Sequence, residues 1–285
     1  MSNLAARFLT AAVLIPFLLA GIFWSNPVGV WALVFLATVL GLTEFYGMTM
    51  AKEPAFERAV AVVLASVLAA SVYWLDTSPH LLLVAFAAVT LSAFVFYLFR
   101  YREIETLSTR VNAMLSGFLY VGLLLTFVAL LKKRGPDGGF WVLITLTVTW
   151  FGDTAAYFAG RFIGPFWPKK LYESVSPKKT VVGAFGGLAG NLLATSLAKL
   201  VYLPSLSWTD CVLVAIPAGM LGQVGDLCES MLKRSVGVKD SGKLLPGHGG
   251  MLDRIDALLF SAPYIYFYAR WFYQWQWPPI HYCSP

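Results

Sequence analysis

The chain has 285 residues, of which 58% are hydrophobic and 13% are charged, and its formal net charge is +6. Soluble proteins carry about 25% charged residues, so this composition excludes an ordinary soluble domain and indicates an integral membrane protein. Basic cytoplasmic loops explain the positive charge, so we expect the lipid bilayer as a partner and no nucleic acid.

Apolar runs of about 20 residues, the length that crosses a hydrocarbon core about 30 Å thick, recur along the chain. The first run lacks a small-residue cleavage site, so we expect it to be a span and not a signal peptide. The short turn SNP, Ser25 to Pro27, separates the first two runs and predicts that they form a helical hairpin. The sequence therefore predicts an all-α polytopic fold of about nine transmembrane helices, at roughly 8–24, 28–50, 59–75, 80–99, 111–131, 139–162, 181–203, 209–232 and 254–275.

Lys and Arg are distributed unequally between alternating loops. With the N-terminus in the cytoplasm, nine spans place sixteen of the 21 Lys and Arg residues on the cytoplasmic side. The positive-inside rule then predicts a multi-pass protein of the cytoplasmic (inner) membrane with an external C-terminus. The loop KKRGPDGG, which begins at Lys132, is an exception because it is basic on the external side.

Acidic residues divide the chain into two parts. The apolar runs before Gly135 contain one acid, Glu44, whereas three acids lie within the later runs. We therefore expect residues 1–135 to form a lipid-facing scaffold of about five helices. Residues 136–285 are expected to form a catalytic domain of about four helices with cytoplasmic loops.

In this topology, five carboxylates converge on the cytoplasmic face, where we expect the active site: Asp153, Asp226, Glu229, Asp253 and Asp256. An ionised carboxylate within a membrane is costly, so such acids indicate function. Pairing with a nearby Lys or Arg at the headgroup level explains any single one of them equally well. It explains the whole set less well.

Carboxylate clusters of this kind suit Mg²⁺, whereas zinc favours Cys or His, and His248 is the only histidine nearby. The same face carries many cations: Lys178, Lys179, Lys233, Arg234, Lys239 and Lys243. Acids that hold a divalent metal beside cations that hold anionic oxygens are typical of phosphoryl or nucleotidyl transfer.

Two stretches are rich in glycine. In PGHGG, Pro246 to Gly250, backbone N–H groups can approach phosphates, although a lone glycine-rich turn is more often only a loop. In GAFGGLAG, Gly183 to Gly190, small residues recur four apart, which favours tight helix packing over ligand binding.

The stretch SMLKRSVGVKDSGKLLPGHGGMLDRID, Ser230 to Asp256, resembles the signature of the phosphatidate cytidylyltransferases, or CDP-diacylglycerol synthases. The preceding GQVGDLCES, and the upstream GDTAAYFAGRFIG and SPKKT, are also similar to that family. The resemblance covers about residues 150–257, and the first five spans resemble the family only in being apolar.

The resemblance implies a homodimer that transfers the cytidylyl group from CTP to phosphatidate in phospholipid biosynthesis, giving CDP-diacylglycerol and pyrophosphate. It implies Mg²⁺ as the cofactor, bound by Asp226 and Asp253. The residues with an implied catalytic role are Asp226, Asp253, Lys239, Asp240 and Arg254. Those expected to contact substrates are Asp153, Arg161, Ser176, Lys178, Lys179, Glu229, Ser230, Lys233, Arg234, Lys243, His248, Gly249, Gly250 and Asp256.

Two other functions fit parts of the pattern. A transporter or proton-coupled channel would also place acids in its spans, but along a pathway across the bilayer and not at one face. A CTP-dependent lipid kinase would transfer the γ-phosphoryl group instead of the cytidylyl group. Label from the α- or the γ-phosphate of CTP distinguishes the two transferases.

Overall fold

The computed structural model describes residues 3–75, 80–100, 104–133, 135–242, 244 and 249–273. Its α-helices are α1 (Asn3–Phe23), α2 (Val28–Thr49), α3 (Ala55–Trp74), α4 (Leu81–Arg100), α5 (Leu107–Gly117), α6 (Leu124–Lys133), α7 (Gly138–Phe162), α8 (Val181–Val201), α9 (Trp208–Ser235) and α10 (Leu252–Trp271). A π-helical segment, Phe118–Leu123, joins α5 to α6, and short 3₁₀ turns lie at Ile104–Thr106 and Gly164–Phe166.

Seven helical segments among the described residues are long and apolar enough to cross a membrane, so the prediction of a helical multi-pass membrane protein is confirmed. They are α2, α3, α4, the long helix Ile104–Lys133, α7, α8 and α9. The apolar part of α1, Ala12–Phe23, is shorter, and α10 begins with a charged turn. The count of nine spans therefore stays a prediction.

A two-stranded antiparallel hairpin, which the all-α prediction missed, interrupts the helices. Strands β1 (Lys170–Tyr172) and β2 (Ser176–Thr180) pair with Lys170 opposite Thr180 and Tyr172 opposite Ser176. Because β2 leads directly into α8, the Thr180 side chain caps that helix by accepting from the Gly183 N–H at 3.0 Å.

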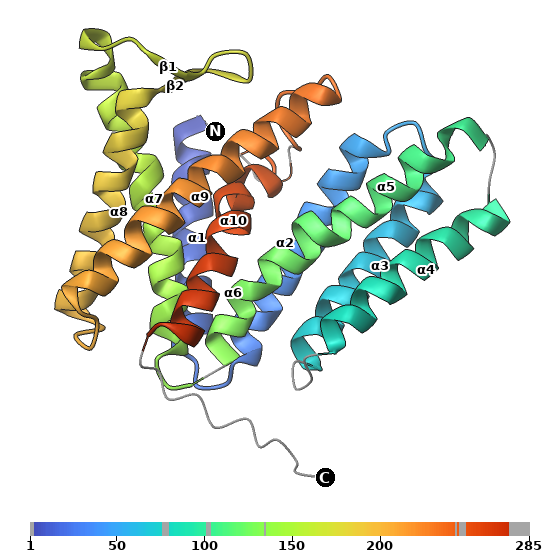
Figure 1. The fold of residues 1–285 in the computed structure, drawn as a ribbon, viewed down its shortest axis with the longest axis horizontal. Coiled ribbons are helices and arrows are strands. Elements are labelled where there is room, and N and C mark those ends of the chain that lie inside the picture. Colours follow the sequence, from blue (N-terminus) through green and yellow to red (C-terminus); the bar gives the residue numbers. More distant parts are fainter. Residues whose placement is uncertain are drawn as a thin grey trace.

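Helix α10 lies in the middle of the molecule, with other helices on both sides of it (Figure 1). It packs against α9 and α7 on one side and against α6 and α2 on the other. The N-terminus, the β-hairpin and the C-terminal end of α9 lie at the same end of the helix bundle (Figure 1). The body of α10 is therefore fixed by helices on both sides.

The glycines of α8 serve tight packing against α7, as the sequence predicted. A Cβ atom at Gly190 would lie 2.7 Å from the Phe151 carbonyl oxygen, and one at Gly183 would lie 3.0 Å from the Ala156 carbonyl oxygen. Larger side chains would therefore push the two helices apart.

The two lysines in the last turn of α6, which are an exception to the predicted charge distribution, have structural roles. The Lys132 ammonium donates to the Ile22 carbonyl at 2.7 Å, and the Lys133 ammonium donates to the Tyr73 carbonyl at 2.5 Å. These carbonyls lie in the last turns of α1 and α3. Both lysines therefore cap the C-terminal ends of helices, where cations are favourable.

Candidate active site

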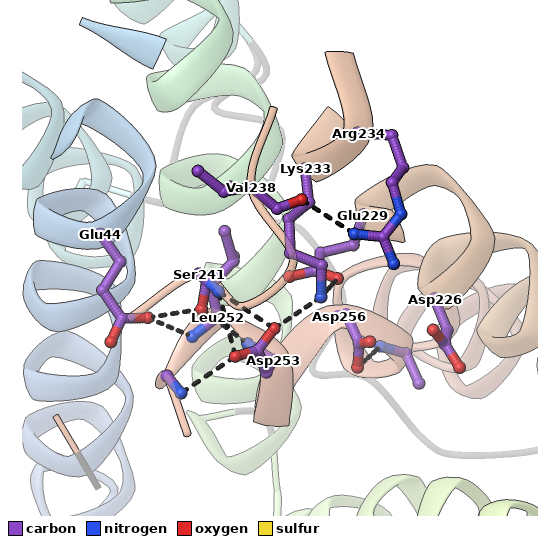
Figure 2. Close-up of polar contacts among 12 residues, drawn as sticks. Glu44, Asp226, Glu229, Lys233, Arg234, Val238, Ser241, Leu252, Asp253 and Asp256 are labelled. Atoms are coloured by element: carbon purple, nitrogen blue, oxygen red, sulfur yellow. Dashed lines mark hydrogen bonds and ion pairs between the residues drawn. The ribbon is translucent and has the colours of Figure 1, made fainter. Parts of the chain in front are cut away.

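The end of α9 and the first turn of α10 hold a buried ion-pair cluster (Figure 2). The Lys233 ammonium lies 2.6 Å from Asp253 Oδ1 and forms a second ion pair with Glu229, one turn earlier on α9. Glu229 is fully buried, and the side chains of Lys233 and Asp253 are each 11% exposed. Unpaired charges would be very costly at this depth, so the three side chains stabilise one another.

Backbone groups hold the Asp253 carboxylate in place. Asp253 Oδ2 accepts from the Gly250 N–H at 3.0 Å and from the Ser241 N–H at 3.2 Å. Ser241 lies in the loop after α9, and Gly250 lies two residues before the start of α10. Asp253 therefore links two parts of the loop between α9 and α10 to Lys233.

A third ion pair joins the hairpin to α9. The Lys179 ammonium lies 2.5 Å from Asp226 Oδ2, and both side chains are about one third exposed. Lys179 is placed there because β2 ends at the capping residue Thr180. Asp226 lies one turn before Glu229, so α9 presents one carboxylate to the hairpin and another to α10.

Two cavities meet at Asp153. The first, here called the hairpin cavity, has a volume of about 420 Å³ and is lined by residues of α7, α8, α9 and the hairpin, including Tyr157, Arg161, Lys178, Lys179, Gln223 and Asp226. The second, here called the apolar cavity, has a volume of about 500 Å³. Apolar side chains of α1, α2, α6 and α7 line most of it, and Asp253, Arg254 and Asp256 lie at its polar part. Asp153 lines both cavities.

Comparisons with known proteins agree with the resemblance seen in the signature stretch. Residues 5–272 match the sequence model described as "Cytidylyltransferase family". A phosphatidate cytidylyltransferase of Synechocystis sp. is 33% identical over 266 residues, covering 83% of this chain and 87% of the relative. One of Brucella suis biovar 1 is 34% identical over 279 residues, covering 95% of each chain. The chain belongs to the phosphatidate cytidylyltransferase family.

Eight of the nineteen predicted site residues of this phosphatidate cytidylyltransferase homologue line the two cavities. Five of them, including Asp153, line the hairpin cavity. Three others line the apolar cavity together with Asp153. Glu229, Lys233 and Gly250 belong to the buried cluster through their contacts. Asp256 is also near, on α10, where its Oδ1 accepts from the Ala257 N–H at 2.7 Å.

The other predicted residues of this family member that the structure describes line neither cavity, although Gly249 lies against the Asp253 carboxylate. Arg234 donates to the Val238 carbonyl at 2.9 Å and thereby shapes the turn after α9. Lys239 and Asp240 are exposed in the same loop, and Ser176 and Ser230 are partly buried. Gly249 has a φ of 84°, a left-handed conformation that favours glycine. Lys243 and His248 lie outside the described residues.

The sequence reasoning did not place Glu44 in the site of this family member, although the structure does (Figure 2). Glu44 lies on α2, and its Oε2 accepts from the Ser241 hydroxyl at 3.0 Å and from the Leu252 N–H at 2.9 Å. The signal was present, because Glu44 is the one acid within an apolar run before Gly135, and intramembrane acids indicate function.

The donor chemistry fits the Mg²⁺ that this family resemblance implies. Mg²⁺ usually binds through one or two carboxylates together with waters and substrate phosphates. Asp226 supplies a carboxylate from α9 and Asp253 one from the first turn of α10, and each pairs with a lysine. Among the described residues, three or more His, Cys, Asp or Glu never gather into a set able to hold a metal. An all-protein metal cage is therefore not formed by that part of the chain.

Proposed function

We propose that this member of the family transfers the cytidylyl group of CTP to phosphatidate, giving CDP-diacylglycerol and pyrophosphate. The observation that carries the proposal is the position of Asp153 between a cavity that holds Arg161, Lys178 and Lys179 and one lined mainly by apolar side chains. A triphosphate matches the cations of the first, and acyl chains match the second. The two substrates then meet beside Asp153.

The chemistry needs charge neutralisation more than a strong base. A phosphate oxygen of phosphatidate attacks the α-phosphorus of CTP, and the bond to the oxygen that bridges the α- and β-phosphorus breaks. A phosphate monoester has a second pKa of about 6, so the nucleophile is already largely dianionic at neutral pH. Repulsion between two polyanions is the main barrier, and cations aimed at the developing charge lower it.

The residues of this chain can divide that task. Lys178, Lys179 and Arg161 line the hairpin cavity and would bind the triphosphate and the leaving pyrophosphate. Arg254 lines the polar part of the apolar cavity and would bind the lipid phosphate. When bound by Asp226 and Asp253, Mg²⁺ would neutralise phosphate charge.

The experiment uses purified protein, phosphatidate in mixed micelles, and CTP labelled in the α- or the γ-phosphate. We expect α-label to enter the lipid and γ-label to leave as pyrophosphate. Entry of γ-label into the lipid would instead show a lipid kinase. Loss of activity in EDTA, restored by added Mg²⁺, tests the cofactor.

We further propose that the protein is a homodimer of the cytoplasmic membrane, with its N-terminus and active site on the cytoplasmic side. The resemblance to the family supports the dimer, and the distribution of Lys and Arg supports the orientation. Crosslinking in native membranes, read as a band of twice the monomer mass, tests the dimer.

A further inference from the structure

We propose that Glu44 is a positioning residue of the active site, which anchors the first turn of α10 and Ser241 of the loop before it and thereby fixes Asp253. Its effect on catalysis rests on the proposed function, whereas its effect on the loop does not. The inference gives the N-terminal helices a defined part in the site.

The first contacts join α2 directly to α10. Glu44 is 9% exposed, and its Oε2 accepts from the N–H of Leu252, the first residue of α10. The first N–H groups of a helix have no intrahelical acceptor, and a negative charge at this end is favourable. The carboxylate of Glu44 therefore stabilises the start of the helix that carries Asp253.

A second route reaches Asp253 through one residue. The Ser241 hydroxyl donates to Glu44 Oε2 at 3.0 Å and accepts from the Asp253 N–H at 3.3 Å. The Ser241 N–H in turn donates to Asp253 Oδ2. Because the hydroxyl has a single proton, its donation to Glu44 leaves it oriented to accept from Asp253.

The shape of the loop agrees with these hydrogen bonds. A Cβ atom at Gly250 would lie 2.6 Å from Glu44 Oε2, and one at Gly242 would collide with the same carboxyl group. The backbone at Gly242 and at Gly250 thus lies against the Glu44 carboxyl group. Any side chain larger than glycine at either position would displace it.

Two variants of Glu44 and one control test the loop itself. The control is Glu53→Gln, since Glu53 is also near the end of α2 but pairs with Arg110 at 3.8 Å. Hydrogen–deuterium exchange is measured for the amides of Gly250, Leu252 and Asp253 in purified protein. We expect Glu44→Ala to accelerate their exchange at least about tenfold, and Glu44→Gln to do so less because its amide oxygen still accepts.

Unchanged exchange of these three amides in Glu44→Ala, or equal acceleration in Glu53→Gln, would overturn the proposal. If Glu44→Ala does not fold, the comparison of Glu44→Gln with Glu53→Gln decides in the same way. This measurement needs no substrate, so it holds even where the wild-type protein fails to transfer the cytidylyl group.

Kinetics test the consequence for catalysis. Mutation of a residue that hydrogen-bonds to a metal ligand typically lowers metal affinity or activity by about 10- to 100-fold. We therefore expect Glu44→Ala to raise the Mg²⁺ concentration for half-maximal activity by about tenfold or more, with little change in KM for phosphatidate. A residue that only supports folding would lower the amount of active enzyme and leave that Mg²⁺ concentration unchanged, which contradicts the positioning role.

Discussion

Replacement of Lys233 by Met should destabilise the protein strongly, and the structure indicates which second change restores it. Lys233 is the cation between Glu229 and Asp253, and all three side chains are at most 11% exposed. Removal of one partner from a buried ion pair costs about 3–5 kcal/mol. Because each 1.4 kcal/mol is tenfold, the ratio of folded to unfolded protein should fall by roughly a hundred- to a few thousand-fold.

The two carboxylates left behind differ in their remaining partners. Asp253 keeps the N–H groups of Gly250 and Ser241, whereas Glu229 is fully buried and loses its ion-pair partner. Glu229→Gln in the Lys233→Met background should therefore recover most of the lost stability, and Asp253→Asn should recover less.

Fluorescence-detected thermal unfolding in detergent measures the single and double variants side by side. Wild-type stability for Lys233→Met would contradict the assignment of a buried ion-pair cluster. A larger recovery from Asp253→Asn than from Glu229→Gln would show that the uncompensated charge is not on Glu229.

Three further predictions concern catalysis and topology. Asp226→Asn and Asp253→Asn should each remove most activity, and the double variant should be little worse than the poorer single one, since ligands of one metal act as a unit. Losses that multiply in the double variant across a Mg²⁺ titration would show that the two aspartates do not bind the same metal. Lys179→Met should raise KM for CTP, whereas Lys132→Met should lower the unfolding temperature with KM unchanged, because Lys132 caps α1; similar KM changes would contradict this division. A reporter fused after Gly242 should be cytoplasmic and one at the C-terminus external, and an accessible cytoplasmic C-terminus would remove one of the nine spans.

Local signals in the sequence predicted the helices well. The run at 139–162 became α7 (Gly138–Phe162), and the run at 181–203 became α8 (Val181–Val201), because charges, prolines and glycines mark the ends of apolar segments. The glycine spacing in α8 likewise predicted its packing, since a period of four residues describes one helix face. These features depend on neighbours within one or two turns.

The missed features depend on distant contacts. Glu44 and Ser241 are 197 residues apart, and no local pattern in the sequence links residues at that separation. The hairpin was missed because SPKKT is short and polar, and the pairing of β2 with β1 is what makes it a strand. Lys132 was read as an exception because charge counting does not reveal that a lysine caps a helix.

The sharing of Asp153 by two otherwise separate cavities has a consequence for the order of substrate binding. The cavities are lined by different residues except for Asp153. With CTP in the hairpin cavity and phosphatidate in the apolar cavity, as proposed above, neither substrate has to pass through the space of the other. Either substrate can then enter first, and both must be present before the phosphates meet. Initial rates at varied CTP and phosphatidate should give intersecting double-reciprocal lines, the pattern of a ternary complex, and not the parallel lines of a covalent enzyme intermediate.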